Sequence, residues 1–175
     1  MEEYFKQKIR SIPDFPKKGI MFRDITTLLE DAESLKKGAH ALCELSKDLD
    51  INKVVGIESR GFIYGSIIAE KLGAGLVLIR KPGKLPSKTN SQSYTLEYGQ
   101  DALEIHKDAI KPGDRVLVHD DLLATGGTAK AACELVEKAG GQIIQLSFII
   151  ELAFLGGKEK FTDYIVSSLV SYDSE

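Results

Sequence analysis

Residues 115–128, RVLVHDDLLATGGT, constrain the fold of this chain more than any other part of its sequence. An apolar run typical of a buried strand ends in two carboxylates, Asp120 and Asp121, and the tetrapeptide TGGT at 125–128 then opens a helix. In an open parallel sheet, ligands bind beyond the carboxyl ends of the strands, where these residues are expected to lie. The segment therefore predicts an α/β fold with a ligand site at this strand-to-helix turn.

The turn has the properties of an anion site. Gly126 and Gly127 let the backbone approach a ligand closely, and the helix N-terminus offers unpaired N–H groups and a partial positive charge. Phosphate is the natural occupant, and Thr125 and Thr128 add hydroxyl donors. The neighbouring carboxylates would repel a phosphate alone, so they favour a phosphorylated sugar with bound Mg²⁺. The alternative is a plain left-handed turn with helix-capping aspartates.

The rest of the chain alternates between strand and helix patterns. Expected strands are 53–57, 74–79, 93–98, 102–105, 114–118, 142–152 and 164–171, and expected helices are 2–10, 33–48, 61–72 and 128–139. Residues 11–29 are expected to be irregular because of their prolines and glycine, and residues 81–92 to form a polar loop. This alternation predicts an α/β fold with a mainly parallel, twisted sheet flanked by helices.

Composition excludes several classes of protein. A chain of 175 residues is expected to form one domain, and its net charge of −3 argues against a protein that coats nucleic acid. No apolar run approaches the roughly 20 residues of a membrane span, and the charged N-terminus does not look like a secretory signal. Cys43 and Cys133 lack metal-site spacing, so we expect two buried thiols, no nucleic-acid or membrane partner, and a cytoplasmic location.

Residues 115–128 resemble the ribose-5-phosphate motif of the type I phosphoribosyltransferases. The resemblance implies that fold, with a small N-terminal hood over 1–33 and a flexible hairpin lid over 81–106. It implies that Asp120 and Asp121 contact the ribose hydroxyls of phosphoribosyl pyrophosphate (PRPP). The residues implied for its 5-phosphate are Ala124, Thr125, Gly126, Gly127 and Thr128. His119 departs from the aliphatic residue usual in the family, and we interpret it as a packed histidine.

Residues 12–29, IPDFPKKGIMFRDITTLL, resemble the base-recognition hood of the adenine-specific branch of this family. The resemblance implies that backbone groups at Met21 and Arg23, with Phe22 between them, read the adenine edge. Such readout is physically reasonable because backbone N–H and C=O groups are fixed donors and acceptors. Leu152 is implied to pack on the face of the base, and Thr27 stands where the branch commonly has proline.

Two further segments resemble the family's pyrophosphate site. Residues 58–62, ESRGF, combine a strand end with a helix start, which suits an anion, although a plain surface arginine is the alternative. The resemblance implies a cis peptide between Glu58 and Ser59. The residues implied to bind pyrophosphate are Ser59, Arg60, Arg80, Lys81 and Lys84.

Residues 94–99, YTLEYG, match the segment in which the family places an active-site glutamate. Glu97, Tyr98 and Arg60 are therefore the implied catalytic residues, with Glu97 acting as an acid/base or only orienting the base. The implied reaction is transfer of 5-phosphoribosyl from PRPP to adenine, which gives AMP and pyrophosphate. Mg²⁺ is expected to bind mainly through PRPP oxygens, with no direct protein ligand named. The resemblance also suggests a homodimer.

Three other functions stay open. The base could be hypoxanthine, guanine or xanthine, since the sequence does not show how the hood backbone is oriented. A non-catalytic PRPP-binding regulator would keep the same motif, but such proteins usually carry a basic DNA-binding segment, which is not evident here. A generic nucleotide-binding domain would not need paired aspartates. The roles of His106 and His119 are also open.

Overall fold

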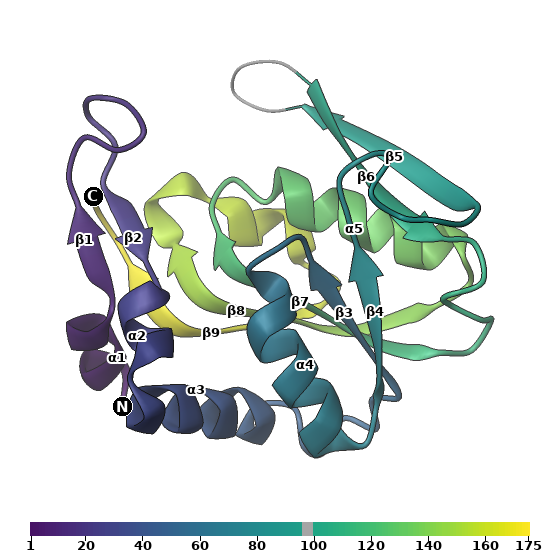
Figure 1. Cartoon of the computed structure of the whole chain (residues 1–175), viewed down its shortest axis with the longest axis horizontal. Helices are drawn as coiled ribbons and strands as arrows, with labels where there is room; N and C mark the ends of the chain where they lie inside the picture. The colour runs from purple at the N-terminus through teal and green to yellow at the C-terminus, as the bar shows by residue number, and fades with distance from the viewer. Residues whose placement is uncertain (96–99) are drawn as a thin grey trace.

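The computed structural model describes residues 1–95 and 100–175 (Figure 1). Its helices are α1 (Glu2–Lys8), α2 (Thr26–Glu30), α3 (Ala32–Glu44), α4 (Gly61–Leu72) and α5 (Gly127–Lys138), with short 3₁₀ turns η1 (Ala153–Leu155) and η2 (Gly157–Phe161). Its strands are β1 (Arg10–Ile12), β2 (Phe22–Asp24), β3 (Lys53–Ile57), β4 (Gly75–Ile79), β5 (Thr89–Thr95), β6 (Gln100–His106), β7 (Arg115–Leu123), β8 (Gln142–Leu152) and β9 (Ile165–Tyr172). Within the described part of the chain, no helix is long and apolar enough to cross a membrane.

The central sheet has five parallel strands in the order β4-β3-β7-β8-β9, which confirms the predicted fold class. The chain leaves β3 through α4 to reach β4, and leaves β7 through α5 to reach β8 on the other side. The strand order therefore reverses between β3 and β7. A reversal of this kind opens a crevice at the carboxyl ends of the two strands, where ligands of α/β proteins bind.

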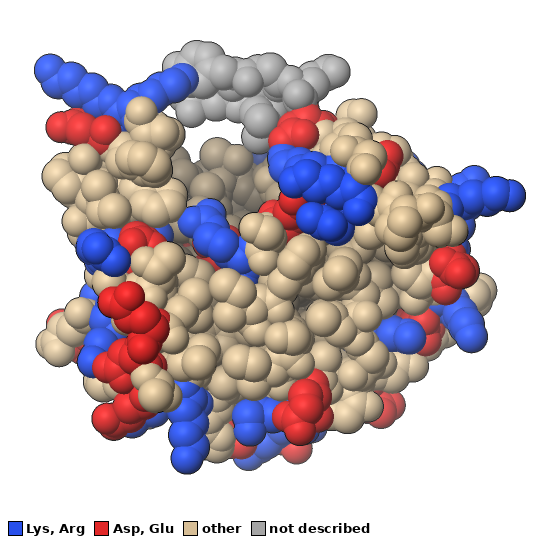
Figure 2. Space-filling view, viewed as in Figure 1, with Lys and Arg blue, Asp and Glu red and all other residues tan. Residues whose placement is uncertain are grey.

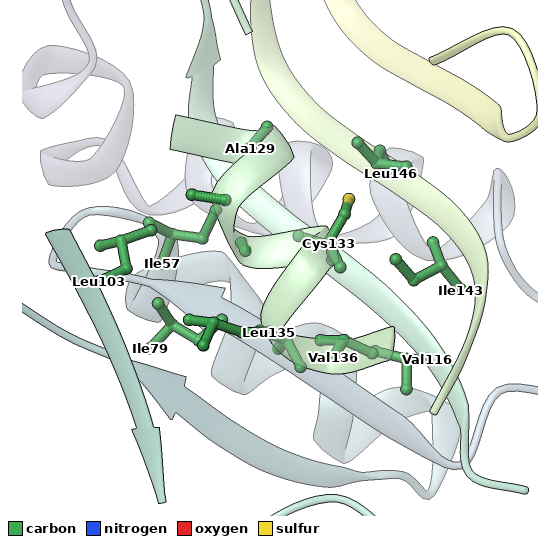
Figure 3. Close-up of a cluster of buried hydrophobic side chains, with 14 of the residues drawn as sticks. Ile57, Ile79, Leu103, Val116, Ala129, Cys133, Leu135, Val136, Ile143 and Leu146 are labelled. Carbon is green, nitrogen blue, oxygen red and sulfur yellow. The ribbon is translucent and has the colours of Figure 1, made fainter. Parts of the chain in front are cut away.

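The core has one layer on each face of this sheet. On one face α5 and strand β6 pack against the sheet through residues such as Leu135, Leu103 and Ile57 (Figure 3). On the other face α1, α3 and α4 pack against alternate residues of the same strands, including Val54 and Leu117. The loop after β3 leads into α4 on one face of the sheet, and the loop after β7 leads into α5 on the other face. Packing on both faces therefore fixes the two loops, and each fully buried Leu or Ile contributes about 1.5–3 kcal/mol to that packing.

Strand β3, helix α4 and strand β8 have the predicted bounds, whereas β7 is longer than predicted. The aspartates of the motif lie inside β7, because its pairing with β8 continues through Asp120↔Phe148 and Leu122↔Ile150 to Leu123. The helix expected over 33–48 ends at Glu44, and Cys43 and Cys133 are both buried and unpaired, as predicted.

The expectation of an irregular segment over 11–29 was wrong. Strands β1 and β2 pair antiparallel, and α2 follows them, while both prolines lie in the connecting loop, where no ladder N–H is needed. Strand β5 begins inside the loop expected over 81–92, and it pairs with β6 as predicted. Figure 1 shows the β1–β2 pair beside outer strand β9 of the central sheet and the β5–β6 pair beside its other outer strand, β4.

Candidate active site

A cavity of about 250 Å³ lies at the carboxyl ends of β3 and β7. Its walls are Glu58, Arg60, Lys81, Tyr94, Leu103, Asp120, Asp121, Leu122, Ala124 and Thr128. Six of these residues were predicted as site residues from the sequence, and they come from three separate segments. Figure 2 shows a hollow in this part of the surface with basic side chains on its rim and acidic side chains within it. The cavity therefore suits a ligand that carries both hydroxyl groups and negative charge.

The two aspartates lie side by side at the end of β7, Asp121 buried and Asp120 partly buried. The carboxylate of Asp121 lies 2.9 Å from Nε of Arg60, and its backbone N–H donates to Oδ1 of Asp120 at 2.9 Å. Burial and the adjacent Asp121 charge raise the pKa of Asp120 well above its usual range. Burial also raises the pKa of Asp121, although Arg60 opposes that shift. Hydroxyl donors or a cation from a ligand would relieve this strain, so the pair is prepared for a polyhydroxylated ligand.

The turn after β7 brings the N-terminus of α5 to the same cavity. Gly126 has a left-handed backbone (φ 80°) and is the N-cap of α5, with Ala124 and Thr128 in the cavity wall. Gly157 closes in from η2, and a β-carbon added there would lie 2.0 Å from the carbonyl oxygen of Ala124. Sequence reasoning missed Gly157. Its only local signal is the Gly156-Gly157 pair after the long apolar strand β8.

Glu58 organises the basic loop, a role that sequence reasoning also missed. Its side chain is 8% exposed, accepts the backbone N–H of Lys81 at 2.7 Å, and ion-pairs with Lys84 and, at 3.4 Å, with Arg80. Burial acts to raise the pKa of Glu58, but these bonds outweigh it and hold the pKa below its usual range. Lys81 itself points into the cavity, where it pairs with Asp101. The Glu58–Ser59 peptide is cis, as expected, and places Ser59 directly before Arg60.

The predicted base-contact residues are only partly brought together. Met21 and Leu152 line a second cavity of about 420 Å³. Phe22 lies beside the first cavity, since the guanidinium carbon of Arg60, one of its wall residues, is 5.6 Å from the Phe22 ring centre. The side chain of Arg23 lines neither cavity and instead covers the ring of Tyr172. Predicted residues Glu97 and Tyr98 lie outside the described part of the chain.

The histidines do not contribute to either cavity. His119 is completely buried in β7, with Nδ1 3.4 Å from Oγ of Ser147, and burial lowers its pKa to about 4. It is therefore a neutral core residue, in keeping with the interpretation as a packed histidine. His106 lines a separate cavity beside the edge strand β4.

Across residues 1–95 and 100–175, no group of three or more His, Cys, Asp or Glu side chains could hold a metal ion. Asp120 and Asp121 nevertheless supply carboxylate oxygens, which are the ligands that Mg²⁺ prefers. Mg²⁺ commonly keeps several waters and binds through one or two carboxylates together with substrate phosphates. The site therefore fits a magnesium ion that arrives with a phosphorylated ligand.

Comparison with known proteins gives consistent results. The model of the phosphoribosyl transferase domain family matches residues 24–174. An adenine phosphoribosyltransferase of Clostridium perfringens is 58% identical over 168 residues, which cover 96% of this chain and 98% of the relative. The crystal structure of adenine phosphoribosyltransferase from Thermoanaerobacter pseudethanolicus has a TM-score of 0.95 at 47% identity and covers 98% of this chain and 100% of that one. The Saccharomyces cerevisiae enzyme, crystallised with an imino-altritol bisphosphate and adenine, has a TM-score of 0.90 at 38% identity, covering 96% and 97%.

Proposed function

The chain belongs to the phosphoribosyl transferase domain family, and we propose that it transfers the 5-phosphoribosyl group of PRPP to N9 of adenine, forming AMP and pyrophosphate in purine salvage. The observation that carries the proposal is the joint placement of two adjacent aspartates and a helix N-terminus in one cavity. A sugar phosphate meets both demands at once, since its hydroxyls donate to the carboxylates while its phosphate accepts from the helix N–H groups.

In this proposal, the donor lies across the first cavity. The loop from Ala124 through Thr125, Gly126 and Gly127 to Thr128 holds the 5-phosphate, and the two aspartates hold the ribose hydroxyls. The pyrophosphate extends toward Ser59 and Arg60 and toward the loop that carries Arg80, Lys81 and Lys84. Support comes from the charge arrangement, because Arg60 and Lys81 line the same cavity as Ala124 and Thr128 of the phosphate loop.

Adenine is proposed to bind beside Phe22, with backbone groups of Met21 and Arg23 at its edge and Leu152 on its face. The side-chain positions support this, since Met21 and Leu152 share a cavity and Phe22 lies next to Arg60. The yeast relative was crystallised with adenine, which favours an amino-purine over hypoxanthine, guanine or xanthine. We propose that residues 1–33 act as the base-recognition hood.

The chemistry requires a positively charged, dry site. Breaking the C1–O bond of PRPP leaves an oxocarbenium-like sugar and a highly charged pyrophosphate, which Arg60, Lys81 and Lys84 would stabilise. Mg²⁺, when bound with PRPP, would supply further positive charge to that leaving group. We propose that residues 81–106 act as a lid that excludes water, with Tyr98 helping it to close and Glu97 protonating or orienting the base.

A cytoplasmic homodimer completes the proposal. Apolar side chains are exposed on α4 and on the edge strand β4, namely Ile63, Leu76 and Leu78, which are 38%, 39% and 36% exposed. Clustered exposed apolar groups are typical of a protein interface. Light scattering should give a mass of twice 19.2 kDa, and a monomer mass at micromolar concentration would contradict the dimer. The two unpaired thiols are compatible with a reducing compartment.

The proposed function is tested by product analysis after mixing the protein with PRPP, Mg²⁺ and, in turn, adenine, hypoxanthine or guanine. AMP from adenine alone, abolished by EDTA, is the expected result. Product from another base would retain the transferase but overturn the assignment of the hood. If PRPP bound by calorimetry yet no base gave product, the non-catalytic regulator would be the better account.

Replacing Glu58 with Ala should raise KM for PRPP about tenfold, because the basic loop loses a backbone bond and its charged partner. Steady-state kinetics with PRPP varied at saturating adenine measures this effect. The control is Glu33→Ala, which removes an exposed ion pair to Lys37 on α3 and should leave KM unchanged. An unchanged or lower KM for Glu58→Ala would show that Glu58 does not position the loop.

A further inference from the structure

Strand β2, which carries the proposed base-reading backbone, has little support of its own. Within the described part of the chain it pairs only with β1, in a register of three residue pairs, and a pair of such short strands is marginal by itself. Its side chains alternate between two faces, so Phe22 contacts Phe15 and Arg60 while Arg23 points to the opposite side. What holds Arg23 therefore helps to fix where the backbone at Met21–Arg23 lies.

Arg23 is held by Tyr172 at the end of the central sheet. Its guanidinium carbon lies 3.9 Å from the centre of the Tyr172 ring, and its Nη1 donates to Oγ of Ser11 on the neighbouring strand β1. Both Arg23 and Tyr172 are partly buried, so water screens their attraction less than at an open surface. Figure 1 shows the C-terminal end of β9 running up beside β1 and β2.

The same tyrosine is in register with the opposite wall of the proposed base site. Tyr172 pairs with Leu152 at the end of β8, and Leu152 lines the cavity that Met21 also lines. Both partners pack against the core cluster below them. A single residue is thus joined through its backbone to Leu152 and through its ring to Arg23.

We propose that Tyr172 is a positioning residue for base recognition, one that sets the spacing between the hood backbone and Leu152. The proposal rests on the function proposed above. Loss of the ring would leave β9 in place, because its end is also tied to α1, where Glu2 accepts the backbone N–H of Ser171 at 3.0 Å. Removing the ring should therefore loosen the hood strand without unfolding the sheet, and affinity for the base should fall while the donor site is unaffected.

The test compares Tyr172→Ala, Tyr172→Phe and Tyr164→Ala in steady-state kinetics with each substrate varied separately. Tyr164 is the control, since its ring is also partly buried against the core but lies outside the proposed hood, where its hydroxyl donates to Glu137 at 2.6 Å. Tyr172→Ala should raise KM for adenine about five- to tenfold and change KM for PRPP less than about twofold. Tyr172→Phe keeps the ring and should restore KM for adenine, and Tyr164→Ala should lose thermal stability with KM for adenine near wild type.

Three outcomes would overturn the proposal. Equal increases in both KM values of Tyr172→Ala would show a general loss of structure, and an equal adenine effect in Tyr164→Ala would show that any ring loss loosens the hood. An unchanged KM for adenine in Tyr172→Ala, with active wild-type protein, would refute the role of Tyr172 alone. If the wild-type protein made no AMP, the proposed function would fail, and the positioning role with it.

Discussion

Replacing Asp120 and Asp121 together with Asn should reduce kcat/KM for phosphoribosyl transfer about 10²- to 10⁴-fold, since two charged hydrogen-bond acceptors are lost. Asn keeps the shape of each side chain but presents one amide donor where the ribose hydroxyls need an acceptor. Initial-rate assays of AMP formation measure the effect. Asp108→Asn, an exposed carboxylate outside the cavity, is the control and should be indistinguishable from wild type.

Removing the charge of Asp120 should stabilise the ligand-free protein, although it lowers activity. Since burial and the Asp121 charge raise the folded-state pKa of Asp120, its ionised form destabilises the ligand-free protein. Asp120 then binds its proton more tightly in the folded state than in the unfolded state. The destabilisation of the folded protein by ionised Asp120 is therefore present above the raised pKa and is lost as the pH falls through that pKa. Asp120→Asn should therefore raise Tm at neutral pH and lose this advantage in acid. A lower Tm at every pH, or activity near wild type for the double variant, would contradict this account of the pair.

Gly157→Ala should raise KM for PRPP about 100-fold or more and lower the stability of the protein by about 1–3 kcal/mol. The added methyl group would lie 2.0 Å from the carbonyl oxygen of Ala124, so the phosphate loop must move. A displacement of about 1 Å in a group that positions substrate is enough for a loss of that size. Steady-state kinetics with PRPP varied at saturating adenine measures the first effect, and thermal denaturation measures the second.

Gly156→Ala provides the matched control for that variant. Gly156 has φ 65°, so alanine there is strained by about 1–2 kcal/mol, but the nearest atoms to its β-carbon would be those of the Glu159 side chain, at an ordinary contact distance of 3.5 Å. It should cost similar stability while KM for PRPP stays near wild type. If both glycine variants weakened PRPP binding equally, the close approach of Gly157 to Ala124 would not be what shapes the phosphate loop.

The local part of this molecule was predictable from its sequence. Strand β3 and helix α4 are a short apolar run followed by a helix that ends at Gly73, and the aspartates with the TGGT turn are close together in the chain. Such features depend on neighbouring residues, so pattern and spacing locate them. The strand pair β1–β2 was missed because three-residue strands are too short to show a period.

The contacts that complete the site come from distant parts of the chain. Gly157 meets Ala124 because β7 and β8 are neighbouring parallel strands that end at one edge of the sheet, and Tyr172 meets Arg23 because the β1–β2 pair lies against the end of β9. Glu58 was missed for a related reason, since its partners lie on a loop more than twenty residues further along the chain. A sequence pattern alone carries no sign of these pairings.

The central claim is that the cavity at β3 and β7 and the cavity at Met21 and Leu152 are two ends of one nucleotide site. A crystal structure of the protein with AMP tests this most directly. We expect the phosphate on the N–H groups of residues 124–128, the ribose hydroxyls on the two aspartates, and adenine between Phe22 and Leu152. AMP bound in the reverse direction, or with its base away from Met21 and Leu152, would contradict the account.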